Sequence, residues 1–183
     1  MPEGREETLG ACPVRPLLLV VPEADVARDM VGLGALAKRD YDLQGPLFPP
    51  HRLHVTMHHF GQHSGPPEDI IARVQEAAST VCAERFEVSF DFMEMWSDAL
   101  VLRGTAMAGL GELHRKLGVA LKKAGLGEWV RSGFTPHVTL MRDRGYVEPQ
   151  MVKTFRWTVR EFVLVNSLIG RTTYVPLAAW QLH

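Results

Sequence analysis

The sequence predicts an α+β fold of two pseudo-symmetric lobes, each built from mostly antiparallel sheet with outer helices, with an active-site cleft between the lobes. Segments with strand and helix periodicity follow one another in the order β-α-β-α-β-β-α-β-β-β. A His-Val-Thr pattern occurs twice in strand-like sequence, each time after a predicted helix. Its histidines, His54 and His137, lie 83 positions apart (137 minus 54), close to half of the 183 residues. This spacing indicates two lobes of similar build.

The composition is that of one folded domain. A hydrophobic content of 46% is sufficient for a core, and the net charge of -1 argues against broad binding to long nucleic acid while leaving room for a small anionic substrate. Two cysteines cannot form a disulfide framework, which fits the reducing cytoplasm. We expect a monomer. Residues 1–13 are polar and predict a flexible leader before a single bilobal domain at 14–183. No apolar run approaches the roughly 20 residues of a membrane span, so no membrane partner is expected.

In the first half, an apolar run at 17–21 predicts a strand that is covered on both faces. Apolar positions at helical spacing predict a helix over 22–39. Gly and Pro make 42–50 a loop, which leads to the first histidine strand at 52–60. A turn at 61–67 follows, and Glu68 and Asp69 then open a helix that runs to about residue 83.

In the second half, alternating Phe and Val predict a strand over 85–95, which forms a hairpin with a second strand at 99–103. Leucines at helical spacing predict a helix over 107–124, with Gly125 as its C-cap. A loop at 127–135 leads to the second histidine strand at 136–142. Two further strands are predicted at 155–167 and 172–182.

Each copy of the pattern presents two polar groups on one face of a strand. Because side chains alternate along a strand, His54 and Thr56 point one way while Val55 points the other, and His137 and Thr139 do the same in the second copy. A single His-x-Thr indicates no more than a half-exposed strand face. The recurrence of the pattern favours two opposed faces that together form one site.

The residues around both copies resemble the two-histidine (2H) phosphoesterases, and among them the bacterial 2′-5′ RNA ligase-like RNA 2′,3′-cyclic phosphodiesterases. The stretch 53–61 is similar to the first motif of the family, and 134–142 is similar to the second, which typically ends in Arg. The segment 162–167, with Tyr174 and Trp180, resembles the closing strand pair. The first motif often carries Arg four residues after its histidine. Here that place is held by His58, which we expect to contact the phosphate.

The resemblance implies hydrolysis of RNA or nucleotide 2′,3′-cyclic phosphate ends to 2′-phosphomonoesters, as in RNA processing, with no metal or other cofactor and with weak reverse 2′-5′ ligation. The partner would be RNA with a 2′,3′-cyclic phosphate end or a small cyclic nucleotide. The leaving group would be O3′. In that scheme His54 donates a proton to O3′ and His137 activates water, and the reverse assignment stays open.

The residue types suit this chemistry. Imidazole titrates near pH 6.5, so a pair can hold one neutral and one protonated member. The threonine hydroxyls can donate to the non-bridging phosphate oxygens. Arg142 is the expected guanidinium at the phosphate, although alternation places it on the face opposite His137 unless the strand ends or bulges first. The aromatic residues that could stack on a base, each also suited to the core, are Phe48, Phe134, Tyr174 and Trp129.

Two other classes of function remain open. Five histidines crowd into residues 51–63 and could supply a metal site. Their faces differ, however, and no Asp or Cys lies nearby to complete a strong ligand set. The second alternative is a non-catalytic module that binds RNA ends or nucleotides. Intact His and Thr in both copies of the pattern argue against it.

Overall fold

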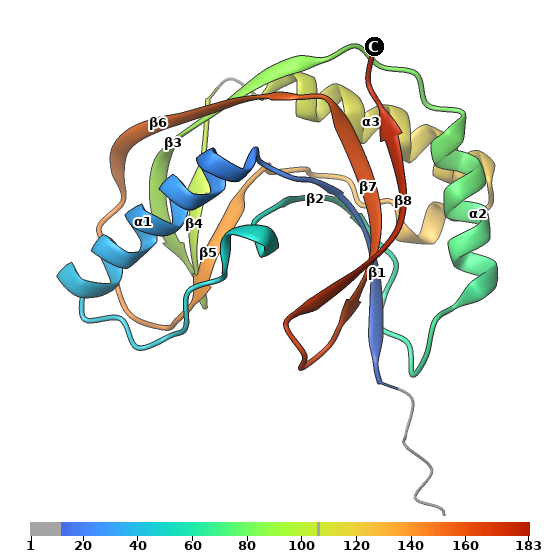
Figure 1. Cartoon of the computed structure of the whole chain (residues 1–183). Coiled ribbons are helices and arrows are strands. Elements are labelled where there is room, and N and C mark those ends of the chain that lie inside the picture. Colours follow the sequence, from blue (N-terminus) through green and yellow to red (C-terminus); the bar gives the residue numbers. More distant parts are fainter. Residues whose placement is uncertain (1–11, 106) are drawn as a thin grey trace, which may run out of the picture.

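The computed structural model describes residues 12–105 and 107–183, which form two four-stranded antiparallel sheets (Figure 1). The first sheet has the order β2-β1-β7-β8, and the second has the order β5-β4-β3-β6. The strands of the first sheet are β1 (Val14–Val20), β2 (Val55–His59), β7 (Glu161–Leu168) and β8 (Thr173–Gln181). Those of the second are β3 (Phe86–Trp96), β4 (Ala99–Arg103), β5 (Val138–Arg142) and β6 (Gln150–Val159).

Three helices cover the sheets. Helix α1 (Ala24–Asp40) packs against β5 and β6, on the left in Figure 1. Helices α2 (Glu68–Ser79) and α3 (Ala108–Lys123) pack against each other, and they also contact β8 and β2 respectively. The units β1-α1-β2 and β4-α3-β5 have the same strand-helix-strand order, and the two strands of each are neighbours in a sheet. The predicted α+β fold with two similar lobes is therefore confirmed. None of the helices in the described part of the chain is long and apolar enough to cross a bilayer.

The three predicted helices are present, with ends that differ by a few residues. The prediction of a single strand over 155–167 is wrong, because the chain passes from the second sheet to the first at the exposed Arg160. The buried residues Trp157 and Val159 belong to β6, whereas Phe162 and Leu164 belong to β7. The shift of the alternation by one residue marks this change of sheet. The predicted leader at 1–13 lies almost entirely outside the described residues.

In its pairing with β1, strand β2 contains one extra residue. Leu19 pairs with Thr56 and Leu17 pairs with His59. Two steps along β1 therefore match three steps along β2, and Met57 is the extra residue. Leu17 and Leu19 lie on the same face of β1, because they are two positions apart. Thr56 and His59 therefore also share a face, although simple alternation would separate them.

Strand β5 has the same irregularity at the equivalent place. Val101 pairs with Thr139 and Ala99 pairs with Arg142, which leaves Leu140 as the extra residue. Ala99 and Val101 share a face of β4, so Thr139 and Arg142 share a face of β5. The two bulges come three residues after each motif histidine, at Met57 and Leu140.

The bulge in β2 turns His58 into the protein. His58 pairs with Leu18 and is only 3% exposed, with its ring stacked on His114 at 4.3 Å between centroids. Its Nε2 lies 3.1 Å from the carbonyl oxygen of His114. Burial lowers the pKa of His58 to about 4, and the hydrogen bond with His114 opposes this shift only in part.

The buried neutral imidazole of His58 predicts an acid-sensitive fold. Because the pKa of His58 is about 4 in the folded protein and about 6.5 in the unfolded chain, the unfolded chain binds more protons between these values. The free energy of unfolding should therefore fall as the pH drops from 6.5 to 4. In His58→Leu this fall should be shallower. Urea unfolding at pH 7.5, 6, 5 and 4 measures it, with the exposed His51→Leu as the control. An equal slope in wild type and His58→Leu would contradict the interpretation.

Candidate active site

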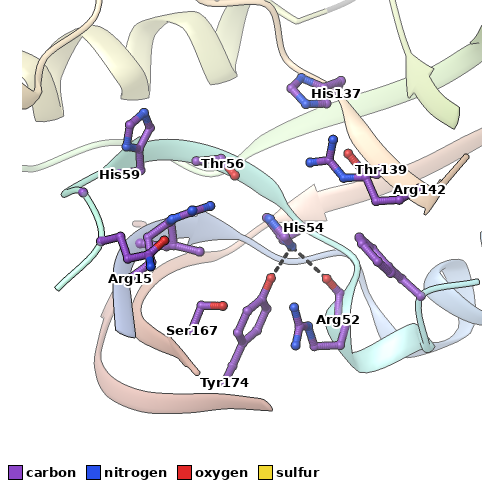
Figure 2. A pocket seen from close by; sticks show the side chains of 14 residues that line it. Arg15, Arg52, His54, Thr56, His59, His137, Thr139, Arg142, Ser167 and Tyr174 are labelled. Carbon is purple, nitrogen blue, oxygen red and sulfur yellow. Dashed lines mark hydrogen bonds between the residues drawn. The ribbon is translucent and has the colours of Figure 1, made fainter. Parts of the chain in front are cut away.

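Both His-Val-Thr copies border one cavity of about 480 Å³. His54 precedes β2, and His137 precedes β5, so the two sheets contribute one imidazole each. Figure 2 shows the rings on different sides of this space, with Thr56 and Thr139 near them. The predicted same-face arrangement of His and Thr is present in both copies. Fourteen residues line the cavity: Arg15, Leu17, Phe48, Arg52, His54, Thr56, His59, Gly61, Gln62, His137, Thr139, Arg142, Ser167 and Tyr174.

Each motif histidine is held by the backbone two residues before it. His54 Nδ1 lies 2.7 Å from the carbonyl oxygen of Arg52, and His137 Nδ1 lies 2.9 Å from that of Thr135. A carbonyl oxygen can only accept, so Nδ1 carries the proton in both neutral rings. The Nε2 atoms are then left without a proton. Each ring can therefore accept a proton through Nε2, or donate one there once it is charged.

The surroundings of His54 favour its neutral form. Burial is the main cause that lowers the pKa of His54 to about 4, and the nearby charge of Arg52 adds to the effect. The hydrogen bond with the Arg52 carbonyl acts in the opposite direction and is outweighed. The Tyr174 hydroxyl lies 3.1 Å from His54 Nδ1 and helps to fix the ring. At neutral pH the free site thus holds an uncharged His54.

The bulges decide which basic side chains face the cavity. Arg142 reaches it on the face of Thr139, while its guanidinium also pairs with Asp98 at 3.0 Å. His59 occupies the equivalent place beside Thr56, since His59 and Arg142 each follow their motif histidine by five positions. His58 does not border the cavity, which corrects the expectation that it would contact the phosphate. The extra residue in β2 is the physical reason, and the sequence pattern gave no sign of it.

The aromatic candidates divide into two groups. Phe48 and Tyr174 line the cavity, as a residue that stacks on a base must. Phe134 lies in a neighbouring hollow, where it stacks on His114 at 4.2 Å between centroids, and Trp129 borders the same hollow. The expectation that Phe134 faces the main cavity is therefore corrected: its ring is already packed against an imidazole.

Besides His59, sequence reasoning missed three cavity residues that bear on binding. Arg52 lies on a 3-10 turn (Pro50–Arg52), with its guanidinium carbon 4.0 Å from the ring centroid of Tyr174. Arg15 extends from β1, and Ser167 lies beside it on β7. Arg52 adjoins the first motif and could have been noticed on that ground. No local pattern connects Arg15 with either motif.

The lining carries a strong excess of basic side chains over acidic ones. It contains three arginines and three histidines but no Asp or Glu. The whole chain, by contrast, has 20 Lys and Arg against 21 Asp and Glu. Positive charge is thus concentrated at this cavity, which suits an anionic ligand.

The structure separates the histidines of residues 51–63. His51 is exposed, His58 is buried against His114, and His63 Nε2 donates a hydrogen bond to the carbonyl oxygen of Phe60 at 2.6 Å. Only His54 and His59 border the cavity. Within residues 12–105 and 107–183, no three His, Cys, Asp or Glu side chains come together as metal ligands would. The geometry therefore gives no support to a metal site built from this segment.

Comparison with solved structures shows the same fold in several proteins. E. coli LigT complexed with 3′-AMP is 23% identical, with a TM-score of 0.76 over 93% of this chain and 98% of LigT. TT0787 of Thermus thermophilus is 19% identical, with a TM-score of 0.76 over 92% and 97%. The PDE domain of MHV ns2 is 16% identical, with a TM-score of 0.54 over 79% and 97%. At these identities the likeness concerns the fold alone.

Comparison with curated proteins found no match. The sequence model of the 2′-5′ RNA ligase superfamily, however, matches residues 23–170, which include both histidine motifs, both bulges and most of the two sheets. The match agrees with the resemblance seen in the motifs, and the LigT-like fold agrees with both. The chain belongs to the 2′-5′ RNA ligase superfamily, within the 2H phosphoesterases.

Proposed function

We propose that the protein is a phosphodiesterase that opens 2′,3′-cyclic phosphate ends of RNA or nucleotides to 2′-phosphomonoesters by two-histidine acid-base catalysis. The observation that carries the proposal is the pair of imidazoles, each fixed through Nδ1 and facing one cavity from different sheets. A hydroxyl accompanies each ring. In-line displacement at phosphorus needs a base and an acid on opposite sides of the phosphate, which is what two such rings supply.

The proposed step is a single displacement. One imidazole takes a proton from water through Nε2 as the water oxygen attacks phosphorus. The bond from phosphorus to O3′ breaks, and the other histidine, protonated, gives its Nε2 proton to O3′. The phosphate stays on O2′. Thr56 and Thr139 donate hydrogen bonds to the non-bridging oxygens, and Arg142 and His59 lie on the same faces as these hydroxyls.

We assign the base role to His54. Its lowered pKa keeps the ring neutral at pH 7, so it can accept a proton from water without first losing one. His137 is then the acid that protonates O3′. This assignment is the reverse of the one that the family resemblance implied, and it follows from the surroundings of His54, which the sequence did not reveal.

Several observations support a phosphate ester of a nucleotide as the substrate. The lining holds no carboxylate, and Phe48 offers a ring to a base. LigT has been crystallised with 3′-AMP, with phosphate and with ATP, so a protein of this fold accepts nucleotides and phosphate. Attack by a 5′-hydroxyl in place of water would join RNA ends through a 2′-5′ link. We propose such ligation as a minor reverse activity, because water competes for the same phosphorus.

The decisive experiment is incubation with an oligonucleotide that ends in a 2′,3′-cyclic phosphate, in the presence of EDTA. We expect an oligonucleotide 2′-phosphate as the product, because the proposed step leaves phosphorus on O2′ and needs no metal. Chromatography against 2′- and 3′-phosphate standards identifies it. A 3′-phosphate product would reverse the leaving group, and loss of activity in EDTA that a single metal restores would contradict metal independence.

Replacement of either motif histidine should nearly abolish turnover. In His54→Ala and His137→Ala, kcat should fall by about 10²–10⁴-fold, because each proton transfer contributes on that order. Substrate affinity should change much less. Single-turnover kinetics and equilibrium binding measure the two effects separately, with His51→Ala as the matched control outside the cavity. Wild-type binding without any turnover would instead indicate a non-catalytic binding module.

Loss of one threonine hydroxyl should slow the reaction by a smaller factor. A hydrogen bond to a charged group contributes roughly 1.5–3 kcal/mol, so Thr56→Val and Thr139→Val should each lower kcat/KM about 10- to 150-fold. Valine keeps the shape of the side chain and the preference for a strand. The exposed Thr154→Val in β6 serves as the control. If neither cavity variant differed from this control, the hydroxyls would not contact the phosphate.

The pH dependence of kcat/KM tests the role of His54. The base must be neutral, and the pKa of His54 is about 4 in the free protein, so kcat/KM should be retained as the pH falls through 6.5 and lost only near pH 4. Steady-state rates from pH 3.5 to 9 measure the profile, with recovery of activity at pH 7 as the check on unfolding. The same profile in His137→Ala assigns the role, because His54 is then the remaining motif histidine: its residual kcat/KM should fall as the pH drops through about 4, and a residual kcat/KM that instead falls as the pH rises above about 4 would mean that His54 acts as the acid.

A further inference from the structure

A row of polar side chains leads away from His54 across the first sheet. Tyr174 pairs with Ser167 across β7 and β8, and Ser167 pairs with Arg15 across β1 and β7. Paired residues of neighbouring strands point to the same face of a sheet, so the three side chains lie side by side on the wall of the cavity. Figure 2 shows Arg15, Ser167, Tyr174 and Arg52 together below His54. The row spans two strand spacings, roughly 10 Å.

Tyr174 joins this row to the catalytic centre. Its hydroxyl oxygen lies 3.1 Å from His54 Nδ1, and the two rings meet edge to face with centroids 5.5 Å apart. Arg52 stacks on the same tyrosine ring with its guanidinium carbon 4.0 Å from the centroid. Two arginines therefore lie on this wall: Arg52 contacts Tyr174 directly, and Arg15 lies beyond Ser167 in the row. A ligand group held here would lie next to the reacting phosphate but would not be that phosphate.

The guanidinium of Arg52 has donors to spare. Its Nε and Nη1 atoms are buried and have no hydrogen-bond partner in the described part of the chain. Buried donors are normally satisfied, and those of a charged group are the most costly to leave unpaired. Arg142 differs, because it already pairs with Asp98. Neither Arg15 nor Arg52 pairs with a carboxylate among residues 12–105 and 107–183.

The charge of the cavity exceeds what one cyclic phosphate requires. A 2′,3′-cyclic phosphate diester carries a single negative charge, and the two threonines, Arg142 and the protonated histidine already suffice for it. Arg15 and Arg52 are two further cations on one wall. A second anionic group of the substrate is the natural partner for them, because guanidinium and phosphate form charge-assisted hydrogen bonds.

We propose that Arg15, Ser167 and Arg52, grouped around Tyr174, form a subsite for a second phosphate, the one attached to the 5′-oxygen of the terminal nucleoside. The inference rests on the proposed function and names its substrate class more narrowly. In the substrate, the ribose separates the 5′-oxygen from the cyclic phosphate. In the cavity, Tyr174 separates Ser167 and Arg15 from His54 in a similar way. In RNA this phosphate is the diester to the preceding nucleotide. In a free nucleotide it is a 5′-monophosphate.

Four substrates test the subsite: a nucleoside 2′,3′-cyclic phosphate, its 5′-phosphorylated form, a dinucleotide ending in the cyclic phosphate, and the same dinucleotide with a neutral methylphosphonate link. Wild-type kcat/KM for the charged dinucleotide should exceed that for the nucleoside by at least about tenfold, as one charge-assisted contact provides. The neutral dinucleotide should lose this advantage. A comparable advantage for the 5′-monophosphate would extend the subsite to free nucleotides, whereas its absence would restrict the subsite to the RNA diester.

The variant that identifies the subsite is Arg15→Gln, since Arg15 is exposed and its loss should not disturb folding. The ratio of kcat/KM between the charged dinucleotide and the nucleoside should fall at least about fivefold in this variant. Arg28→Gln on α1 removes the same charge outside the cavity and should keep the wild-type ratio. Equal rates for charged and neutral dinucleotides, or an unchanged ratio in Arg15→Gln, would overturn the subsite. Failure of the proposed function is distinct, because then no cyclic phosphate would be opened.

Discussion

One extra residue in each histidine strand determines which side chains reach the cavity. The pleat of a regular strand would send Thr56 and His58 to one face and His59 to the other. The bulge at Met57 instead places His59 on the face of Thr56 and turns His58 to the other face. The bulge at Leu140 likewise brings Arg142 to the face of Thr139. Both strands remain paired on either side of the bulge, so the loss of ladder hydrogen bonds is confined to the extra residue. Leu140 and Met141, two apolar residues in succession at the bulge of β5, are both buried.

The bulges also mark the limit of what the sequence could predict. Alternation of apolar residues located most strands and the helices, and the two His-Val-Thr copies located the cavity, because both depend on neighbours within a few positions. A bulge depends on the register with another strand, which no local window contains. For this reason, the spacing of His58 and Arg142 in the sequence does not predict which face of the strand each side chain occupies. The boundary between β6 and β7 at Arg160 is different, because the alternation of apolar residues itself shifts there and the sequence contains the signal.

The cavity concentrates arginines in a protein with almost no net charge, and one of them, Arg52, acts directly on His54. Arg52 acts on His54 in two opposite ways. Its carbonyl oxygen accepts a hydrogen bond from Nδ1 and raises the pKa of His54, while its guanidinium charge lowers that pKa. Burial is the largest effect, and it keeps the ring neutral. Arg52 thus fixes the orientation of the imidazole, whereas burial sets its protonation. The residue directly before the first motif therefore belongs to the immediate surroundings of His54.

The two-fold likeness of the lobes extends to the hydrogen bond at each Nδ1 but not to the surroundings of the rings. His54 is enclosed by Arg52 and Tyr174. His137 lies beside Trp96, with the two ring centroids 4.6 Å apart. Its Nδ1 donates to the carbonyl oxygen of Thr135, which is an exposed residue. Displacement at phosphorus needs two different proton states from two chemically identical groups. A perfectly symmetric site would give both rings the same pKa and no preference for either role. The asymmetry around the motifs, supplied by residues outside them, is what can separate base from acid.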